Sequence, residues 1–137
     1  MNIQDCIFCK ITRREIPSKI IYENSLSLAF LDISPISEGH TIVITKKHYS
    51  TLEDIPDHDL AELYKVVKKI ARMIHEKLQI DGYNILQNNF TAAGQIVKHF
   101  HVHIIPRNFD DGKFRVKIPR TPADETELHN VLKKIKS

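Results

Sequence analysis

The sequence predicts an α+β domain with an antiparallel sheet of about five strands, one long helix and a short C-terminal helix. Short segments with period-two alternation are separated by turn residues, and one long segment carries apolar residues at helical spacing. No repeat or linker divides the chain. Strands joined by short turns pair antiparallel, and a helix covers one face of their sheet. We therefore expect a single domain over residues 1–137, of which residues 108–137 are a C-terminal extension.

The composition is that of an ordinary soluble protein, with 42% hydrophobic and 27% charged residues. The net charge of +3 is too small to indicate nucleic-acid binding, which we regard as unlikely. No apolar stretch approaches the length of a membrane span, and no signal-peptide pattern opens the chain. Two cysteines do not make a disulfide framework, so a reduced, cytoplasmic protein is expected.

The first part of the chain predicts a short segment and three strands. Residues 6–11 fit either a strand or one helical turn. Residues 20–22 and 26–31 form a hairpin pattern around a polar turn, and the β-branched run at residues 40–45 predicts a third strand.

The long helix is predicted from Asp57 to about Gln79. Pro56 suits its first turn, and Gly82 is expected to close it. Apolar side chains at helical spacing predict the buried side: Leu60, Leu63, Tyr64, Val67, Ile70, Ala71, Ile74 and Leu78.

The last part of the chain predicts two more strands and the short helix. Residues 83–88 read as a fourth strand and residues 99–105 as a fifth, which Pro106 is expected to end. Residues 114–118 fit a sixth strand or an extended arm. Residues 121–124 resemble a capping box that starts the C-terminal helix, with proline at its first position.

The fifth strand carries three of the eight histidines, His99, His101 and His103, in alternation with apolar residues. Alternate residues of a strand project to one face, so the three imidazoles should form a row with steps of roughly 6–7 Å. Such a row on a half-buried strand indicates catalysis, metal binding or both.

Cys6 and Cys9 have three possible interpretations: a redox dithiol, half of a metal site, or two buried thiols. Zinc takes thiolate and imidazole ligands, usually four in a tetrahedron. His48 and His99 are the plausible partners for the two cysteines. Of the remaining histidines, we expect His40 to be hydrogen-bonded behind the site and three to face solvent, namely His58, His75 and His129.

A neutral imidazole held in one tautomer can attack phosphorus and carry the transferred group covalently. His101 fits this role best, since it lies in the middle of the row. His103 on the same face could donate to a phosphate, and Asn88 and Gln95 add carboxamide donors.

The segment Gly94–Arg107 resembles the signature of the histidine-triad (HIT) nucleotide hydrolases and transferases, which is His-φ-His-φ-His-φ-φ with φ apolar, commonly preceded by Gly-Gln. The resemblance extends from residue 6 to about residue 107. Its other matching segments are Cys6–Ile11 with Glu15–Pro17, Ala29–Pro35, Gly39–Thr41 and Lys46–His48.

This resemblance implies that His101 is the nucleophile on the α-phosphorus of a nucleotide and that His103 contacts the phosphate. Asn88 and Gln95 match phosphate-side positions, with Gln95 counted among the catalytic residues, and Asp32 matches the residue that binds the ribose hydroxyls. The apolar wall around a purine base would comprise Ile7, Phe8, Ile11, Phe30, Leu31 and Ile33.

The resemblance also implies a structural zinc ion on Cys6, Cys9, His48 and His99, no organic cofactor, and a homodimer formed through the long helix and strand edges. Two positions depart from the family pattern. Phe90 stands where a glycine is usual, so the turn is expected to follow a different path. Ile96 stands where a serine or threonine hydroxyl is usual.

Three functional hypotheses follow. The first is an enzyme that hydrolyses purine nucleoside phosphoramidates or dinucleoside polyphosphates through a nucleotidyl-histidine. The second is a purine-nucleotide-binding regulatory module with little turnover. The third is a catalytic metal centre on His99, His101 and His103, which the geometry of one strand disfavours.

Overall fold

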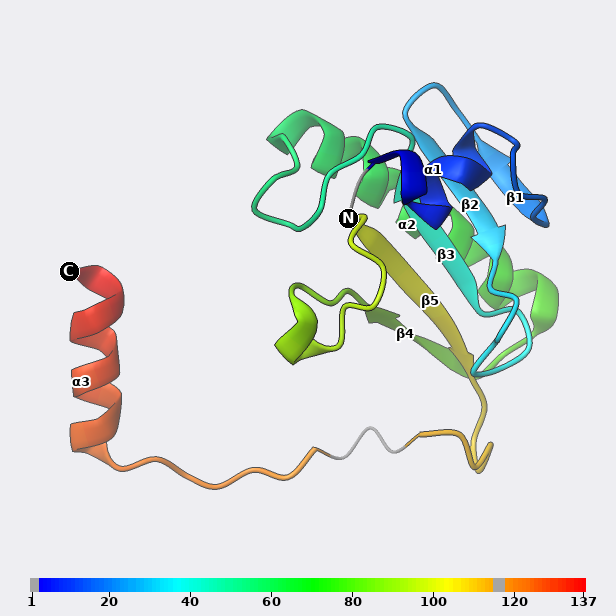
Figure 1. The fold of residues 1–137 in the computed structure, drawn as a ribbon. Helices are drawn as coiled ribbons and strands as arrows, with labels where there is room; N and C mark the ends of the chain where they lie inside the picture. The colour runs from blue at the N-terminus through cyan, green and yellow to red at the C-terminus, as the bar shows by residue number, and fades with distance from the viewer. Residues whose placement is uncertain (1–2, 115–117) are drawn as a thin grey trace.

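A five-stranded antiparallel sheet contains the predicted fifth strand next to its edge, which confirms the predicted fold class (Figure 1). The computed structural model describes residues 3–114 and 118–137. The strands follow the order β1-β2-β3-β5-β4, with bounds Ile20–Glu23 (β1), Ser27–Leu31 (β2), Thr41–Thr45 (β3), Gly82–Leu86 (β4) and His101–Arg107 (β5). The helical elements are η1 (Ile3–Asp5), α1 (Ile7–Thr12), α2 (Asp57–Leu78), η2 (Thr91–Ala93) and α3 (Glu125–Lys136).

The long helix α2 covers one face of the sheet, and α1 packs against the other (Figure 1). Most of the predicted apolar side of α2 is buried, together with Val66, whereas Tyr64 and Leu78 are exposed. The α2 face of the sheet contributes Ala29, Val43, Val102 and Ile104 to the core. The α1 face contributes Leu28, Phe30, Ile42 and Ile44.

The end of α2 differs from the prediction. The helix stops at Leu78, and Gln79 caps it in the left-handed conformation with φ 52°. Gly82 does not close the helix but begins β4. A non-glycine residue thus takes the position where helices commonly place glycine, and the buried Ile80 follows it directly.

The histidine row is confirmed for two of its three members. In β5, Val102 and Ile104 face α2, while His101 and His103 project to the face that α1 covers. The expectation that His99 begins this strand is wrong, because β5 starts at His101. The row therefore divides between a strand and the segment that enters it.

Pro106 does not end β5, which continues to Arg107. Pairing with β3 extends only to Ile104, so Pro106 lies beyond the last pair on that side. Its carbonyl points to that side and accepts a hydrogen bond from the Ser37 hydroxyl over 2.6 Å. The N–H that proline lacks would point the same way, so its absence removes no bond between the strands.

The C-terminal helix exists, but it begins later than predicted. Asp124 caps α3 by accepting from the Glu127 N–H over 2.8 Å, and Glu127 accepts from the Asp124 N–H over 3.1 Å. This reciprocal pair makes Asp124, not Thr121, the cap. The possible sixth strand at residues 114–118 falls largely outside the described residues. Every residue of α3 is exposed.

Smaller differences concern element ends. Residues 6–11 are helical in α1, one of the two alternatives, and three predicted strands shift by one or two residues to 27–31, 41–45 and 82–86. Among the described residues, no helix is long and apolar enough to cross a membrane.

Candidate functional site

Four predicted metal ligands meet where α1 packs against the segment before β5. Cys6, Cys9, His48 and His99 place their ligand atoms within 4.8 Å of one another. Cys6 Sγ lies 3.5 Å from Nδ1 of His99, and Cys9 Sγ lies 3.3 Å from Nδ1 of His48 and 3.5 Å from Nδ1 of His99. The structure thus brings together side chains that are up to 93 residues apart in the chain.

These distances fit a tetrahedral zinc site. Zinc bonds of about 2.3 Å to sulfur and about 2.0 Å to nitrogen place a sulfur and a nitrogen about 3.5 Å apart in a tetrahedron. Burial raises the pKa of Cys9 to about 11, with the Cys6 thiol contributing in the same direction. A metal ion is the partner that would offset this preference for the neutral thiol, because zinc binds thiolate.

His99 presents its Nδ1 to the cysteines because its other nitrogen is committed elsewhere. Nε2 lies 2.8 Å from the carbonyl oxygen of Thr45, which can only accept, so Nε2 carries the proton. The ring is fully buried, and burial lowers the pKa of His99 to about 4. The neutral Nε2–H tautomer, which leaves Nδ1 free to bind a metal, is therefore fixed by the main chain of β3.

The backbone also fixes the tautomer of His101. Nδ1 of this ring lies 2.6 Å from the carbonyl oxygen of His99, so the proton is on Nδ1 and the Nε2 lone pair is free. Burial lowers the pKa of His101, and the ring is neutral at pH 7. An oriented, neutral imidazole with a free nitrogen is what nucleophilic attack requires.

His103 takes the opposite tautomer through His40. The Ile36 N–H donates to Nδ1 of His40 over 3.1 Å, so the His40 proton is on Nε2. This Nε2 lies 2.9 Å from Nδ1 of His103, which must accept, and the His103 proton is therefore on Nε2. Burial, helped by His101 and His40, lowers the pKa of His103 to about 4. His103 can thus donate one hydrogen bond while it is neutral.

The two catalytic histidine candidates lie side by side with different functions. Their ring centroids are 4.9 Å apart. One ring offers a lone pair and its neighbour an N–H, as a phosphorus electrophile and its oxygen would require. His40 was expected only as a hydrogen-bonded histidine. Its contact with His103 could not be read from the sequence, because 63 residues separate the two.

The predicted apolar wall divides into a buried and an exposed part. Phe8, Ile11 and Phe30 are buried in one cluster with Cys6 and Cys9. The other three residues are exposed and open to a ligand, namely Ile7 at 42%, Leu31 at 37% and Ile33 at 88%.

The residues predicted to make polar contacts with a ligand differ in how they are hydrogen-bonded within the protein. Asp32 accepts from the Ser34 N–H through Oδ1, while Oδ2 lies 3.7 Å from Nε2 of His40. Asn88 is half-buried and donates to the Gly94 carbonyl over 3.4 Å.

Both ends of the Gln95 side chain are used within the protein. Its Oε1 accepts from the Phe90 N–H over 2.9 Å, and its Nε2 donates to the Ser50 carbonyl over 2.6 Å. With 2% exposure, Gln95 is placed to hold the loop around Phe90. Its predicted contact with a phosphate remains a prediction.

The two positions that depart from the family pattern lie in the loop between β4 and β5. Phe90 has φ 69° and ψ 159°, a backbone conformation that glycine favours. In this turn a phenylalanine therefore has a backbone conformation that is usual for glycine. Ile96 is 87% exposed and supplies no hydroxyl.

The nearby cations are engaged elsewhere. Lys98 donates to Thr91 Oγ1 and to the Gln95 carbonyl, and Arg107 is bound by Asp111. The third hypothesis, a metal on all three histidines of the row, disagrees with the geometry, since His99 faces the cysteines while His103 faces His40.

Comparison with known proteins identifies the family of this chain. Residues 13–110 match the model of the HIT domain, and the chain belongs to the HIT family. It is 38% identical to an adenosine 5′-monophosphoramidase of Candida albicans over 96% of this chain and 89% of that protein. A crystal structure from Streptococcus mutans superposes with a TM-score of 0.92 at 39% identity, covering 98% of this chain and 85% of that one. A zinc-bound histidine-triad protein of Mycobacterium smegmatis superposes with a TM-score of 0.77 at 36% identity, covering 98% of both chains.

Proposed function

We propose that this protein is a nucleotide hydrolase that acts at the α-phosphorus of purine nucleoside phosphoramidates or dinucleoside polyphosphates. The observation that carries the proposal is the opposite tautomers of two adjacent rings. His101 has a free Nε2 lone pair, and His103 has an Nε2–H. The chemistry follows from this pair.

In the first step, Nε2 of His101 attacks the α-phosphorus, and the bond from phosphorus to the leaving group breaks. The leaving amine, phosphate or nucleotide departs with the electron pair of the broken bond and takes up a proton from solvent. His103 donates to an oxygen of the phosphoryl group, where negative charge builds up. In the second step, water attacks the nucleotidyl-His101, releases the nucleoside monophosphate and restores the neutral ring.

The remaining groups supply binding. A carboxylate such as Asp32 suits the ribose hydroxyls, and the exposed Ile7, Leu31 and Ile33 suit the faces of a purine. The phosphoramidase activity of the Candida albicans relative supports an amine as the leaving group. We assign Asn88 and Gln95 to the phosphate side of the pocket.

A zinc ion held by Cys6, Cys9, His48 and His99 would be structural. All four positions are taken by protein side chains, which leaves none for substrate. The zinc-bound relative from Mycobacterium smegmatis supports this assignment. We further expect a homodimer, because β4 is an edge strand with Tyr83 and Ile85 about 40% exposed on the side of α2.

The test is to trap the intermediate. Zinc-loaded protein is mixed with adenosine phosphoramidate, quenched and digested, and mass spectrometry should find an adenylyl group on the peptide that contains His101. The variant His101→Ala should have no turnover, but calorimetry should show that it still binds adenosine monophosphate. His58→Ala, which changes an exposed histidine of α2, is the matched control and should turn over normally. Turnover by His101→Ala at the wild-type rate would refute the mechanism.

The alternative is a purine-nucleotide-binding module with little turnover. Ile96 favours it, because no side-chain hydroxyl stands beside the leaving group at this position. Binding of adenosine monophosphate without any turnover of phosphoramidates or dinucleoside polyphosphates would support the module over the enzyme.

A further inference from the structure

One proton of His40 lies within reach of two acceptors. The Ile36 N–H donates to Nδ1 of this ring, so Nε2 carries the single N–H of the neutral imidazole. Nδ1 of His103 is 2.9 Å from Nε2 and accepts its hydrogen bond, while Oδ2 of Asp32 is 3.7 Å from the same nitrogen. His40 is buried, and burial lowers its pKa, so the ring is neutral at pH 7 and has no second proton to share.

The main chain keeps Asp32 beside His40. The Asp32 N–H donates to the His40 carbonyl over 2.9 Å, directly after the last residue pair of β2 and β3. The other carboxylate oxygen, Oδ1, accepts from the Ser34 N–H over 2.8 Å and so fixes the direction of the carboxylate. A movement of less than about 1 Å would bring Oδ2 into hydrogen-bond range of Nε2 of His40.

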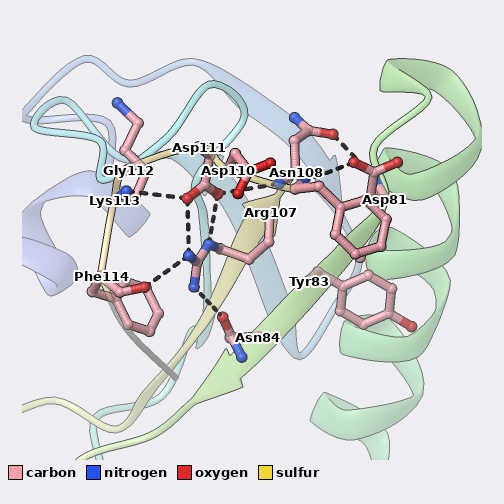
Figure 2. A pocket seen from close by; sticks show the side chains of 12 residues that line it. Asp81, Tyr83, Asn84, Arg107, Asn108, Asp110, Asp111, Gly112, Lys113 and Phe114 are labelled. Carbon is pink, nitrogen blue, oxygen red and sulfur yellow. Dashed lines mark hydrogen bonds and ion pairs between the residues drawn. The ribbon is translucent and has the colours of Figure 1, made fainter. Parts of the chain in front are cut away.

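The loop that precedes His40 is also fastened to the end of β5. The His40 N–H donates to the Ser37 carbonyl over 3.0 Å, and the Ser37 hydroxyl donates to the Pro106 carbonyl over 2.6 Å. The next residue, Arg107, donates to three neighbours that hold this strand end, namely Asp111, Asn84 and Phe114 (Figure 2). The position of the His40 ring is therefore set by a well-anchored part of the sheet.

The carboxylate is the stronger of the two acceptors, because a hydrogen bond to an ionised group is roughly twice as strong as one between neutral groups. The side chain of Asp32 is 19% exposed, so solvent can donate to Oδ2 in the free protein. A bound nucleoside would displace that solvent. Sugar hydroxyls would replace it as donors, whereas a sugar without hydroxyls would leave a covered carboxylate that gains most by taking the proton of His40.

Loss of the hydrogen bond from His40 would release the tautomer of His103. While His40 donates to Nδ1 of His103, the His103 proton is on Nε2, where it can reach a phosphoryl oxygen. Once His40 donates to Asp32 instead, the ring of His103 is free to carry its proton on Nδ1. Nε2 would then present a lone pair to the phosphoryl oxygen and could not stabilise the negative charge that builds up there.

We propose that Asp32 and His40 make the rate of catalysis depend on the sugar hydroxyls of the nucleotide. A ribose that donates to Oδ2 of Asp32 keeps the proton of His40 on His103, whereas a sugar without hydroxyls lets Asp32 take it. This dependence rests on the proposed hydrolysis and deepens it, since the sugar then determines kcat as well as binding. In this scheme Asp32 contacts the substrate, and His40 is a positioning residue.

Steady-state kinetics of zinc-loaded protein test the dependence with adenosine phosphoramidate and its 2′,3′-dideoxy analogue. In wild type, the analogue should lower kcat about tenfold or more, in addition to any increase in KM. The matched variant is His40→Gln, because a carboxamide has two N–H groups and can donate to Asp32 and to His103 at once. Its kcat values for the two substrates should agree within about threefold. Equal kcat values in wild type, or the same ratio in both proteins, would overturn the proposal.

A second measurement reads the tautomer of His103 in wild type without turnover. Long-range ¹H–¹⁵N spectra of the imidazoles are recorded with saturating adenosine monophosphate and then with its 2′,3′-dideoxy analogue. The Nε2–H form of His103 should dominate with the first ligand and should lose about half of its population or more with the second. His101 is the internal control, because its main-chain acceptor should keep the proton on Nδ1 with both ligands.

An unchanged His103 tautomer would overturn the sharing of the His40 proton, even if the two kcat values differed. Absence of any phosphoramidate turnover would instead refute the hydrolase, while the spectra would still decide whether Asp32 takes the proton. Failure of the proposed sharing and failure of the proposed function are therefore distinguishable.

Discussion

The ring of Phe8 meets the ring of His101 edge to face, with centroids 5.0 Å apart. The same phenylalanine lies 5.9 Å from the ring of His99. Because Phe8 lies between Cys6 and Cys9 in the sequence, the segment that supplies two metal ligands also packs against the ring of the proposed nucleophile. Binding of a metal by the cysteines should therefore help to hold the ring of His101 in position.

The first prediction concerns removal of the metal. Chelation, or Cys9→Ser, should lower the melting temperature by at least about 10 °C, because α1 loses its attachment to His48 and His99. It should also lower kcat for an adenosine phosphoramidate, although both catalytic candidates are unchanged. Calorimetry measures the melting temperature and steady-state kinetics measures kcat, while zinc analysis verifies that the metal has been removed.

His58→Ala is again the control, since it removes a histidine that binds no cluster atom. Equal melting temperatures for the zinc-loaded and chelated wild-type protein would rule out a structural role for the metal.

The sequence could predict the four metal ligands of this cluster. It could not predict the hydrogen bonds that fix the rings of His99 and His101. Residue type makes Cys6, Cys9, His48 and His99 plausible zinc ligands, and the resemblance to the HIT family implies the full set. The hydrogen bonds from His99 to the Thr45 carbonyl and from His101 to the His99 carbonyl depend on main-chain positions, which no residue type reveals.

The second prediction concerns His40, which positions His103. His40→Ala should lower kcat/KM by about tenfold or more, because His103 loses the donor that fixes its tautomer. The pKa of His103 should rise from about 4, since His40 is one of the groups that lower it. Long-range ¹H–¹⁵N spectra of the imidazoles report both the tautomer and the pKa. His40→Gln keeps an N–H donor and should recover part of the rate.

A lower rate with an unchanged His103 tautomer would contradict the positioning role. It would point to a general loss of structure, which the melting temperature of the variant would reveal.

The third prediction is a loss of stability in acid. The pKa of His103 is about 4 in the folded protein and 6.5 ordinarily, so between these values the unfolded chain binds more protons. The free energy of unfolding should be highest above pH 6.5 and should decrease as pH falls toward 4. His103→Asn should lose less stability than wild type between about pH 7.5 and about pH 5, as measured by urea unfolding of zinc-loaded protein. If the free energy of unfolding fell equally with pH in wild type and in His103→Asn, this prediction would be contradicted.

The fourth prediction concerns the turn at Phe90. Phe90→Gly should stabilise the protein by about 1 kcal/mol, because glycine adopts φ 69° without the steric cost that phenylalanine has there. Phe90→Ala removes the ring but keeps the strain, so it should not stabilise. Thermal unfolding of the two variants separates these effects, and equal stabilisation by both would mean that the exposed ring, not the backbone, is responsible.

The turn also shows where sequence reasoning reached its limit. A bulky residue at a glycine position predicted a changed path, whereas the structure gives Phe90 a backbone conformation that glycine favours. The buried carboxamide of Gln95 holds this loop, because it accepts from the Phe90 N–H and donates to the Ser50 carbonyl. Elements with strong periodicity, such as α2, were predictable almost to the residue, but contacts between distant loops were not.

His99 contributes to the two sites through different parts of one residue: its imidazole faces the cysteines, and its carbonyl oxygen accepts a hydrogen bond from Nδ1–H of His101. A carbonyl is present whichever amino acid occupies position 99. A mutation can therefore remove the metal ligand at position 99 but leave the main-chain acceptor that fixes the tautomer of His101. Descendants of this chain could lose zinc one ligand at a time and keep a correctly oriented His101, provided that other packing came to hold the strand in place.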